Sequence, residues 1–351
     1  MEEYRQLYYN SMCNQSKFGY FDSWQFLATS SHSFSFFLIP LNFYGSYCII
    51  FKTPSKMRRV KWVMLNLHIW TGLFEIMMTT LITPYFFFPS ICGFSVGVLA
   101  FLGVDIKVQI FLGQICCGGL FSSLLMLFEN RHNYLVTSKW KIPNNKCRII
   151  YFFFVYLYGF GFMFPAYLNE PNQVEAKLII LKTMIPCPTT EFFDSQVYVL
   201  ILNTKYAVYP IILYIFITAI QTFFFVFHSF FHLFHTSSQM SIRTKELQKK
   251  YLIGACLQVA IPIGVLLIPM IPCIIAIFLN YYNQAMFNIS VLCISLHGMS
   301  ATIVLIYINE PYRIFTIRLF RKQKIDNLTS IHLNSRFHSK SNVAKSTRGV
   351  L

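Results

Sequence analysis

Seven long stretches of mostly apolar residues dominate the chain, and shorter polar segments separate them. A helix needs about 20 residues to cross roughly 30 Å of hydrocarbon, and each stretch is about that long. The runs are continuous, whereas the strands of a membrane barrel alternate over about 10 residues. The pattern therefore predicts an all-α, GPCR-like bundle of seven transmembrane helices over Ser33–Phe51, Trp62–Pro84, Val108–Phe128, Cys147–Leu168, Tyr206–Leu233, Tyr251–Leu279 and Asn288–Ile308.

The distribution of positive charge gives the bundle a direction. The chain has a net charge of +16, which in a soluble protein would suggest a nucleic-acid partner. Here 23 of the 29 Lys and Arg residues lie in the first, third and fifth loops, at the start of the fourth run and in the C-terminal tail. Because basic loops stay in the cytoplasm, this distribution predicts an N-terminus outside and a tail inside. Topology and contact with anionic lipid of the bilayer account for the basic loops, so we expect no nucleic-acid partner.

The same pattern divides the chain into four parts. Residues 1–32 are expected outside the cell, and residues 33–310 form the seven-helix receptor domain. Residues 311–322 begin with Pro311 and carry apolar residues mainly on one side, which is typical of a short amphipathic helix on the membrane surface. Residues 323–351 are polar and are expected to be disordered. The N-terminus has no basic segment before a short apolar core, so the first run is interpreted as an uncleaved signal anchor.

Three of the ten cysteines fall in segments predicted to face the oxidising side of the membrane. Cys92 lies between the second and third runs, and Cys187 lies in the long loop after the fourth. We expect a disulfide between these two, with free thiols or competition from Cys13 as the alternatives. Asn14, in an Asn-Gln-Ser sequence on the same side, is a candidate glycosylation site.

No catalytic pair, phosphate-binding glycine loop or metal cluster is visible, so neither an enzyme nor a cofactor is expected. His228 and His232 are spaced like two zinc ligands on one helical face, and His235 follows. No carboxylate or thiolate accompanies them, so we interpret them as interface or core histidines.

Two features inside the predicted spans suggest a moving bundle. Glu75 is an acidic residue deep in the second run, and His68 lies on a similar face of the same helix. A buried charge is costly unless it is paired, so these residues are either a switching polar node or a hydrogen bond between helices. Pro262, Pro269 and Pro272 in the sixth run predict helix kinks.

The sequence Glu129-Asn130-Arg131 stands where the third run meets the cytoplasm. Arg131 could pair with Glu129 or with an acidic group on another helix, and a partner protein could break that pair. The alternative is a basic flank that reaches the lipid headgroups.

Read together, several motifs resemble nematode seven-transmembrane serpentine chemoreceptors, most closely class H (srh). Neighbouring classes such as D and I, or another str-superfamily class, share parts of the pattern. The resemblance covers roughly residues 30–322. Its motifs are Phe51–Trp62 with Leu65–His68, Phe128–Arg131, His297-Gly298 and Asn309–Arg313.

This resemblance implies a G-protein-coupled receptor on the plasma membrane, in the cilium of a sensory neuron, that detects environmental chemicals. A volatile or lipophilic ligand is expected among the outer halves of spans three, five, six and seven. A heterotrimeric G protein would dock inside, near Arg131 and a second group consisting of Asn309, Pro311, Tyr312 and Arg313. Because Asn130 separates Glu129 from Arg131, and because Asn309-Glu310-Pro311 departs from the wider rhodopsin-like pattern, these roles are assigned by position.

The alternatives are a ligand-gated cation channel of the insect odorant-receptor kind and a small-molecule transporter. The channel would have its N-terminus inside, which the charge distribution disfavours. The transporter is disfavoured because no internal repeat is visible and a single acidic residue lies deep in a span.

Overall fold

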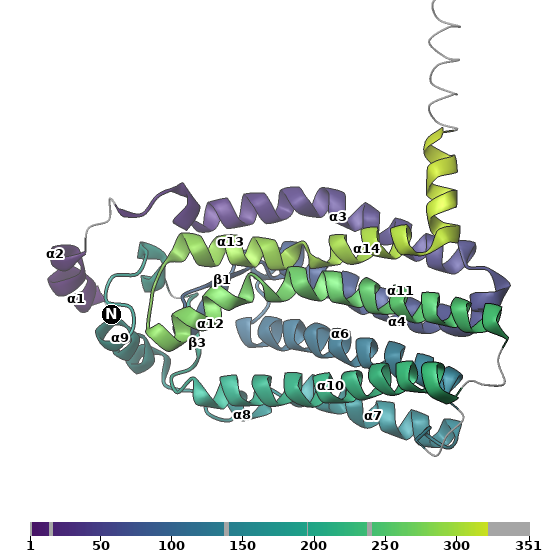
Figure 1. The fold of residues 1–351 in the computed structure, drawn as a ribbon. Helices are drawn as coiled ribbons and strands as arrows, with labels where there is room; N and C mark the ends of the chain where they lie inside the picture. Colours follow the sequence, from purple (N-terminus) through teal and green to yellow (C-terminus); the bar gives the residue numbers. More distant parts are fainter. Residues whose placement is uncertain (1, 14–16, 137–139, 195, 237–240, 322–351) are drawn as a thin grey trace, which may run out of the picture.

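Seven long helical segments lie side by side in the computed structural model, which describes residues 2–13, 17–136, 140–194, 196–236 and 241–321 (Figure 1). By length and composition, six of them could cross a membrane, and the exception is α4, which packs against α3, α6 and α14. The seven segments are α3 (Trp24–Lys52), α4 (Arg58–Ile76), α6 (Ile106–Leu135), α7 (Asn145–Gly161), α10 (Lys205–Phe231), α11 with α12 (Ile242–Leu267 and Met270–Leu279), and α13 with α14 (Gln284–Ser295 and His297–Ile308).

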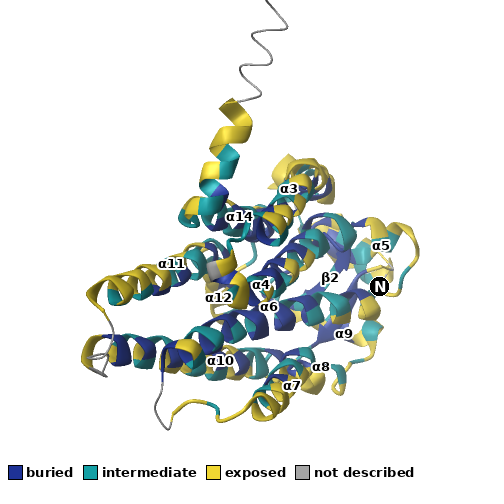
Figure 2. Ribbon diagram, turned by 90° about the vertical axis from the view of Figure 1, so that its right-hand side faces the viewer, coloured by how far each residue is buried: buried dark blue, intermediate teal, exposed yellow. Residues whose placement is uncertain are grey.

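Burial divides the bundle into a centre and a rim. In Figure 2, which looks along the bundle, α4 and α6 lie centrally, and α3, α14, α11, α10 and α7 surround them. The central α6 is largely buried, whereas α10 exposes Phe216, Phe223 and Phe227. Apolar side chains on the outside and small or polar ones inside are what a bundle surrounded by lipid requires.

Polar side chains cap the N-termini of several of these helices. Ser23 accepts a hydrogen bond from the backbone N–H of Phe26 at the start of α3, and Asp105 accepts one from Lys107 at the start of α6. Asn144 does the same for α7. These caps satisfy donors that the first helical turn leaves unpaired.

The structure is mostly helical, as predicted, but a small antiparallel sheet that the sequence did not indicate covers one end of the bundle. It consists of β1 (Pro84–Phe86), β2 (Ile91–Ser95) and β3 (Tyr198–Ile201), in the order β1-β2-β3. Tyr85 pairs with Phe94, and Cys92 with Val199. Short elements surround the sheet: α1 (Glu2–Tyr4), η1 (Arg5–Tyr9), α2 (Asn10–Met12), η3 (Tyr20–Asp22), α5 (Val98–Phe101), α8 (Phe164–Tyr167), α9 (Gln173–Thr183) and η6 (Thr190–Phe193). We call this end of the bundle the sheet end.

The opposite end, here called the tail end, carries the turns η4 (Ser55–Met57) and η7 (His232–Thr236), and a helix over residues 310–321. This helix stands across the axis of the bundle in Figure 1. Tyr312 anchors it, because its side chain is fully buried and its hydroxyl is 2.6 Å from Oγ1 of Thr53. The tail beyond residue 321 and Asn14 lie outside the described residues.

The helix bounds refine the predicted spans. α3 begins at Trp24, nine residues before the predicted start, and the second span ends in the turn η5 (Met77–Leu81) before Pro84 enters the sheet. The sixth span is broken between α11 and α12. Pro269 stands at this junction and Pro272 in the first turn of α12, where a missing N–H costs least. Pro262 lies inside the continuous helix α11.

Candidate functional site

A cavity of about 270 Å³ lies at the sheet end, between the sheet and the adjoining ends of α4, α6 and α7. Its wall is mainly apolar and includes Phe74 of α4, Met78 of η5 and Phe94 of β2. None of the residues that line it, all within the described part of the chain, carries a charge. This sheet-end pocket overlaps only in part with the site expected among spans three, five, six and seven. α6 and α10 line it, but α11–α14 contribute none of its wall, and the sheet forms much of the rest.

Two glutamines of α6 supply most of the polarity of the sheet-end pocket. Gln109 is 2% exposed and Gln114 is 8% exposed. Their amide groups donate hydrogen bonds of 2.8 Å to the backbone carbonyls of Val104 and Phe160, respectively. The Oε1 atoms of both glutamines are buried and have no hydrogen-bond partner within the described residues.

The loop between α7 and α10 forms a lid over this end and is covalently tied to the N-terminal segment. Cys187 forms a disulfide with Cys13, and the Tyr9 hydroxyl donates a hydrogen bond to the carbonyl of Pro188. α9 and η6 belong to this lid. Their buried side chains form one apolar cluster with those of the sheet, which includes Tyr85, Phe87, Ile180, Leu181 and Phe192.

The expected Cys92–Cys187 disulfide is therefore wrong. The N-terminal helices fold back onto the loop and bring Cys13 to Cys187, with a Cα–Cα distance of 5.5 Å. Cys92 is a buried free thiol 2.8 Å from the Ser90 hydroxyl, and burial raises its pKa to about 12.

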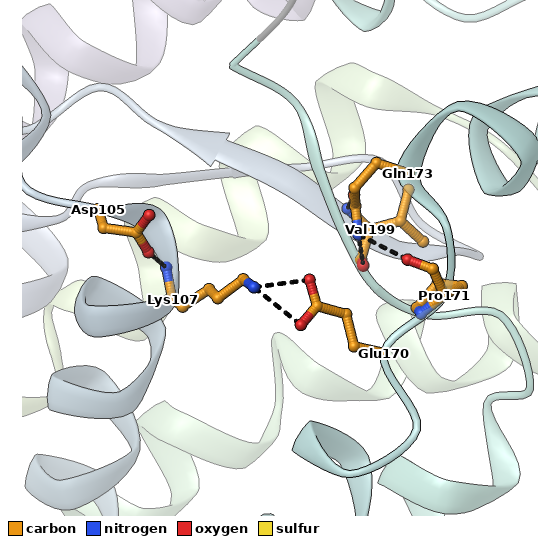
Figure 3. Close-up of polar contacts among 6 residues, drawn as sticks. All are labelled: Asp105, Lys107, Glu170, Pro171, Gln173 and Val199. Carbon is orange, nitrogen blue, oxygen red and sulfur yellow. Dashed lines mark hydrogen bonds and ion pairs between the residues drawn. The ribbon is translucent and has the colours of Figure 1, made fainter.

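Polar contacts fix the first part of the lid to α6 and to β3, the strand in which the lid ends (Figure 3). Nζ of Lys107 lies 2.8 Å from the carboxylate of Glu170, and the Lys107 backbone N–H is held by Asp105. The Gln173 side chain both accepts from and donates to the backbone of Val199. The Lys107–Glu170 pair is partly exposed and adds little stability, so its effect is to orient the rim of the pocket.

The predicted node of His68 and Glu75 exists as a buried cluster centred on Asn42 of α3. Asn42 donates a hydrogen bond to the Glu75 carboxylate, and its backbone oxygen lies 2.9 Å from Nε2 of His68. Thr302 of α14 donates to the Asn42 side-chain oxygen at 3.4 Å. The cluster joins α3, α4 and α14.

Two glycines make room for this cluster. A Cβ at Gly45 would lie 2.7 Å from the His68 ring, and one at Gly298 would lie 2.6 Å from the Glu75 carboxylate. Sequence reasoning missed Asn42 and Thr302. Asn42 is a polar residue inside the first apolar run, and that position could have indicated its role.

At the tail end, Glu129 pairs with Arg148 of α7, and Arg131 takes no part in this pair. Arg148 donates two hydrogen bonds, of 2.9 and 2.7 Å, to the Glu129 carboxylate and a weaker one of 3.3 Å to Asn130. Glu129 is 1% exposed, so this is a buried ion pair between α6 and α7.

Arg131 lines two adjoining cavities of about 530 and 660 Å³, which we call the tail-end cleft. Its Nε has no hydrogen-bond partner within the described part of the chain. Lys250 and Arg313 line the first cavity, and Arg59 and Lys141 line the second. Residues from both halves of the chain line the cleft, and its charged side chains are basic except for Glu310.

The predicted group at the end of the seventh span lies at this cleft. Asn309, Pro311 and Arg313 line it, while Tyr312 is buried behind it. Arg313 donates to the backbone carbonyl of Tyr307 at 3.0 Å.

The three histidines of the fifth span do not form a metal cluster within the described residues. Nδ1 of His228 lies 2.9 Å from Nε2 of His132, which joins α10 to α6.

Comparison with known proteins identifies the family. The model for the serpentine type 7TM GPCR chemoreceptor Srh matches residues 22–322. The chain belongs to this family. The Srh receptor is also 28% identical over 319 residues to "Serpentine receptor class H-72" of Caenorhabditis elegans, covering 89% of the chain and 90% of that relative. Squid rhodopsin, a solved structure, covers 84% of each chain at 12% identity with a TM-score of 0.49.

Family membership settles the class of protein. The chain is a G-protein-coupled chemoreceptor of class H and a multi-pass membrane protein, and the class H prediction is confirmed. The family is a receptor family, not an enzyme family, and its membership does not favour the channel or transporter alternative.

Proposed function

We propose that this Srh receptor binds a small environmental molecule in the sheet-end pocket and transmits the event to a heterotrimeric G protein at the tail-end cleft. The observation that carries the proposal is the uncharged, mainly apolar cavity of about 270 Å³ beneath the lid. It lies just below the 300–1,000 Å³ usual for small-molecule sites, which suits a volatile or other compact ligand.

The proposed orientation places the sheet end outside the cell. The charge distribution along the loops supports it. The Cys13–Cys187 disulfide supports it independently, because disulfides persist on the oxidising side of a membrane. The tail holds a second acceptor sequence, Asn327-Leu328-Thr329, which this orientation places inside the cell. A glycosidase-sensitive mobility shift that disappears in Asn14→Gln, but persists in Asn327→Gln, would agree with this orientation. A shift that depends on Asn327 would contradict it.

A short path of contacts leads from the sheet-end pocket to the cluster around Asn42, which joins α3, α4 and α14. Phe74 lines the sheet-end pocket, and its ring lies 5.2 Å from the ring of His297. The next residue, Glu75, packs against Gly298 and bonds to Asn42. A ligand that moves Phe74 can therefore bias how α14 sits on α3 and α4, provided that it binds the two arrangements with different affinities.

At the other end, the mainly basic side chains of the tail-end cleft suit an acidic or carboxylate-bearing segment of the G protein. Nε of Arg131 is buried and has no partner among the described residues, and Lys250 and Arg313 line the same cavity. A planar guanidinium binds carboxylates through paired hydrogen bonds. Location in the cilium of a sensory neuron is the further expectation for such a receptor.

The experiment is ligand-dependent G-protein activation in cultured cells, with a substitution that fills the pocket. Gly113 lines the pocket, and a Cβ there would meet only the end of the Ile82 side chain, at 3.3 Å. Gly113→Leu should raise the half-maximal ligand concentration at least about tenfold at unchanged surface expression. The matched control is Gly264→Leu on α11, where a Cβ meets nothing within 4 Å.

Equal responses of Gly113→Leu, Gly264→Leu and the unaltered receptor would contradict the proposed ligand site. Absence of activation with every Gα, despite surface expression and measured binding, would contradict the coupling role.

A further inference from the structure

We propose that the sheet-end pocket selects neutral, largely apolar molecules that donate a hydrogen bond, such as aliphatic alcohols and phenols, over the matched aldehydes, ketones and ethers. This inference rests on the proposed ligand site and adds the chemical class of ligand.

The orientation of the two glutamine amides is the first step. An amide side chain has one end that donates and one that accepts, and a backbone carbonyl only accepts. Gln109 contacts the carbonyl of Val104, and Gln114 contacts that of Phe160. Each NH₂ group must therefore face its carbonyl, which assigns the free end of each side chain as an oxygen.

The free oxygens are the second step. Both Oε1 atoms are buried among apolar neighbours without a partner in the described chain. Leaving such an acceptor unpaired costs free energy that a donor can recover. Both glutamines belong to the wall of the pocket, whereas Val104 and Phe160 do not. The geometry therefore leaves the acceptor of each amide for the pocket.

The other polar groups of the wall are already engaged as donors. Ser95 donates its hydroxyl to the backbone carbonyl of Ile82, and the thiol of Cys92 is paired with Ser90. The Tyr198 hydroxyl is paired with Glu170. A ligand that only accepts hydrogen bonds would bring its own carbonyl or ether oxygen next to the two glutamine oxygens, with only the weakly donating thiol of Cys117 within the described wall to meet it.

The absence of charge in the wall restricts the class further. An ammonium group or a carboxylate would lose its hydration and find no opposite charge among the residues that line the cavity. The ligands that fit the wall are therefore neutral molecules that donate a hydrogen bond. Gln109 and Gln114 are five residues apart on one helix, so their backbones lie about 7.5 Å apart along its axis. A ligand with a single hydroxyl is thus expected to depend mainly on one of them.

The test uses matched series of primary alcohols, aldehydes and methyl ethers of equal length, together with phenol and anisole. The first readout is the rise in Tm of the purified receptor with each compound, which needs no G protein. The second is G-protein activation in cells. We expect each alcohol to bind at least about tenfold more tightly than its ether and its aldehyde.

Gln109→Met and Gln114→Met keep the length of the side chain and remove its oxygen. In at least one of them, the preference for alcohol over ether should fall to about threefold or less, while the affinity for the ether stays nearly constant. The control for the binding readout is Gln258→Met, which carries the same substitution on α11, away from the sheet-end pocket; because Gln258 also lines the tail-end cleft, this control is read by Tm and not by G-protein activation.

Equal or tighter binding of the ethers or aldehydes overturns the proposed ligand class. So does a preference for alcohols that survives both substitutions, or a failure of every alcohol and phenol to raise the Tm. The proposed ligand site fails separately, if Gly113→Leu leaves binding of all three series unchanged.

Discussion

The contact between Gly118 of α6 and Gly159 of α7 gives a sharp prediction about the packing of the bundle. A Cβ at Gly118 would lie 1.9 Å from the backbone oxygen of Gly159 and 2.4 Å from its carbonyl carbon. The carbonyl of Gly118 also accepts a hydrogen bond of 3.0 Å from the Tyr214 hydroxyl of α10. Gly118→Ala therefore pushes against a backbone where three helices meet.

The magnitude follows from the distances. An ordinary contact begins at 3.4 Å, so the two helices must separate by about 1.5 Å, the difference between 3.4 and 1.9 Å. Inserting atoms into a packed core costs about 1–3 kcal/mol when side chains can adjust. Here the obstacle is backbone, so we expect about 3 kcal/mol or more. For a chain of this size, that corresponds to a fall in Tm of about 5–10 °C.

The assay is thermal unfolding of the purified receptor in detergent, followed by an unfolding-sensitive dye or by loss of monodisperse protein. The control is Gly161→Ala, two residues beyond Gly159, where a Cβ meets nothing within 4 Å. This control should leave Tm unchanged or slightly raised, because alanine favours a helix more than glycine does. If the Tm values of Gly118→Ala and Gly161→Ala agree within about 2 °C, the close approach of α6 and α7 is refuted.

Three further predictions concern the ion pair and the cysteines. Arg148→Ala leaves the buried carboxylate of Glu129 unpaired and should cost about 3–5 kcal/mol of stability, seen as a lower Tm; adding Glu129→Gln should restore most of it, and no restoration would speak against a buried pair. Cys13→Ser should lower the stability by about 2–4 kcal/mol, whereas Cys92→Ser should not remove a disulfide from a non-reducing gel; equal damage from both would contradict the pairing. Because burial raises the pKa of Cys92 to about 12, its thiol stays protonated near pH 8.5, where an ordinary thiol is half ionised. A maleimide should therefore label exposed Cys147 in the solubilised receptor long before Cys92, and equal rates would disprove the burial.

The helical spans could be predicted from the sequence because lipid imposes a pattern that each segment carries by itself. A run of apolar residues of the right length is enough, and even α4 was found despite His68 and Glu75. The sheet could not be predicted in this way. Its strands have only three to five residues, and β3 pairs with β2 from more than 100 residues further along the chain.

The partners of the site residues were harder to predict for the same reason. The sequence put Glu129 near Arg131, but neighbours along a helix point in different directions, and Arg148 reaches Glu129 from α7. The presence of a polar node was predicted from the cost of burying Glu75, whereas its hub, Asn42, required the packing of α3 against α4. The proposed ligand site differs from the expected one because the sheet, which the sequence did not predict, forms part of its wall.

The Cys13–Cys187 disulfide has a consequence for how the two halves of the receptor can move. It closes residues 13–187 into a covalent ring that contains α3, α4, α6 and α7. A protease that cuts any loop within the ring releases no fragment until the disulfide is reduced. The segment α10–α14 is attached to the ring at one end only, and it contains the break at Pro269. Rearrangement of this open half against the closed ring would widen or narrow the tail-end cleft without straining the covalent framework.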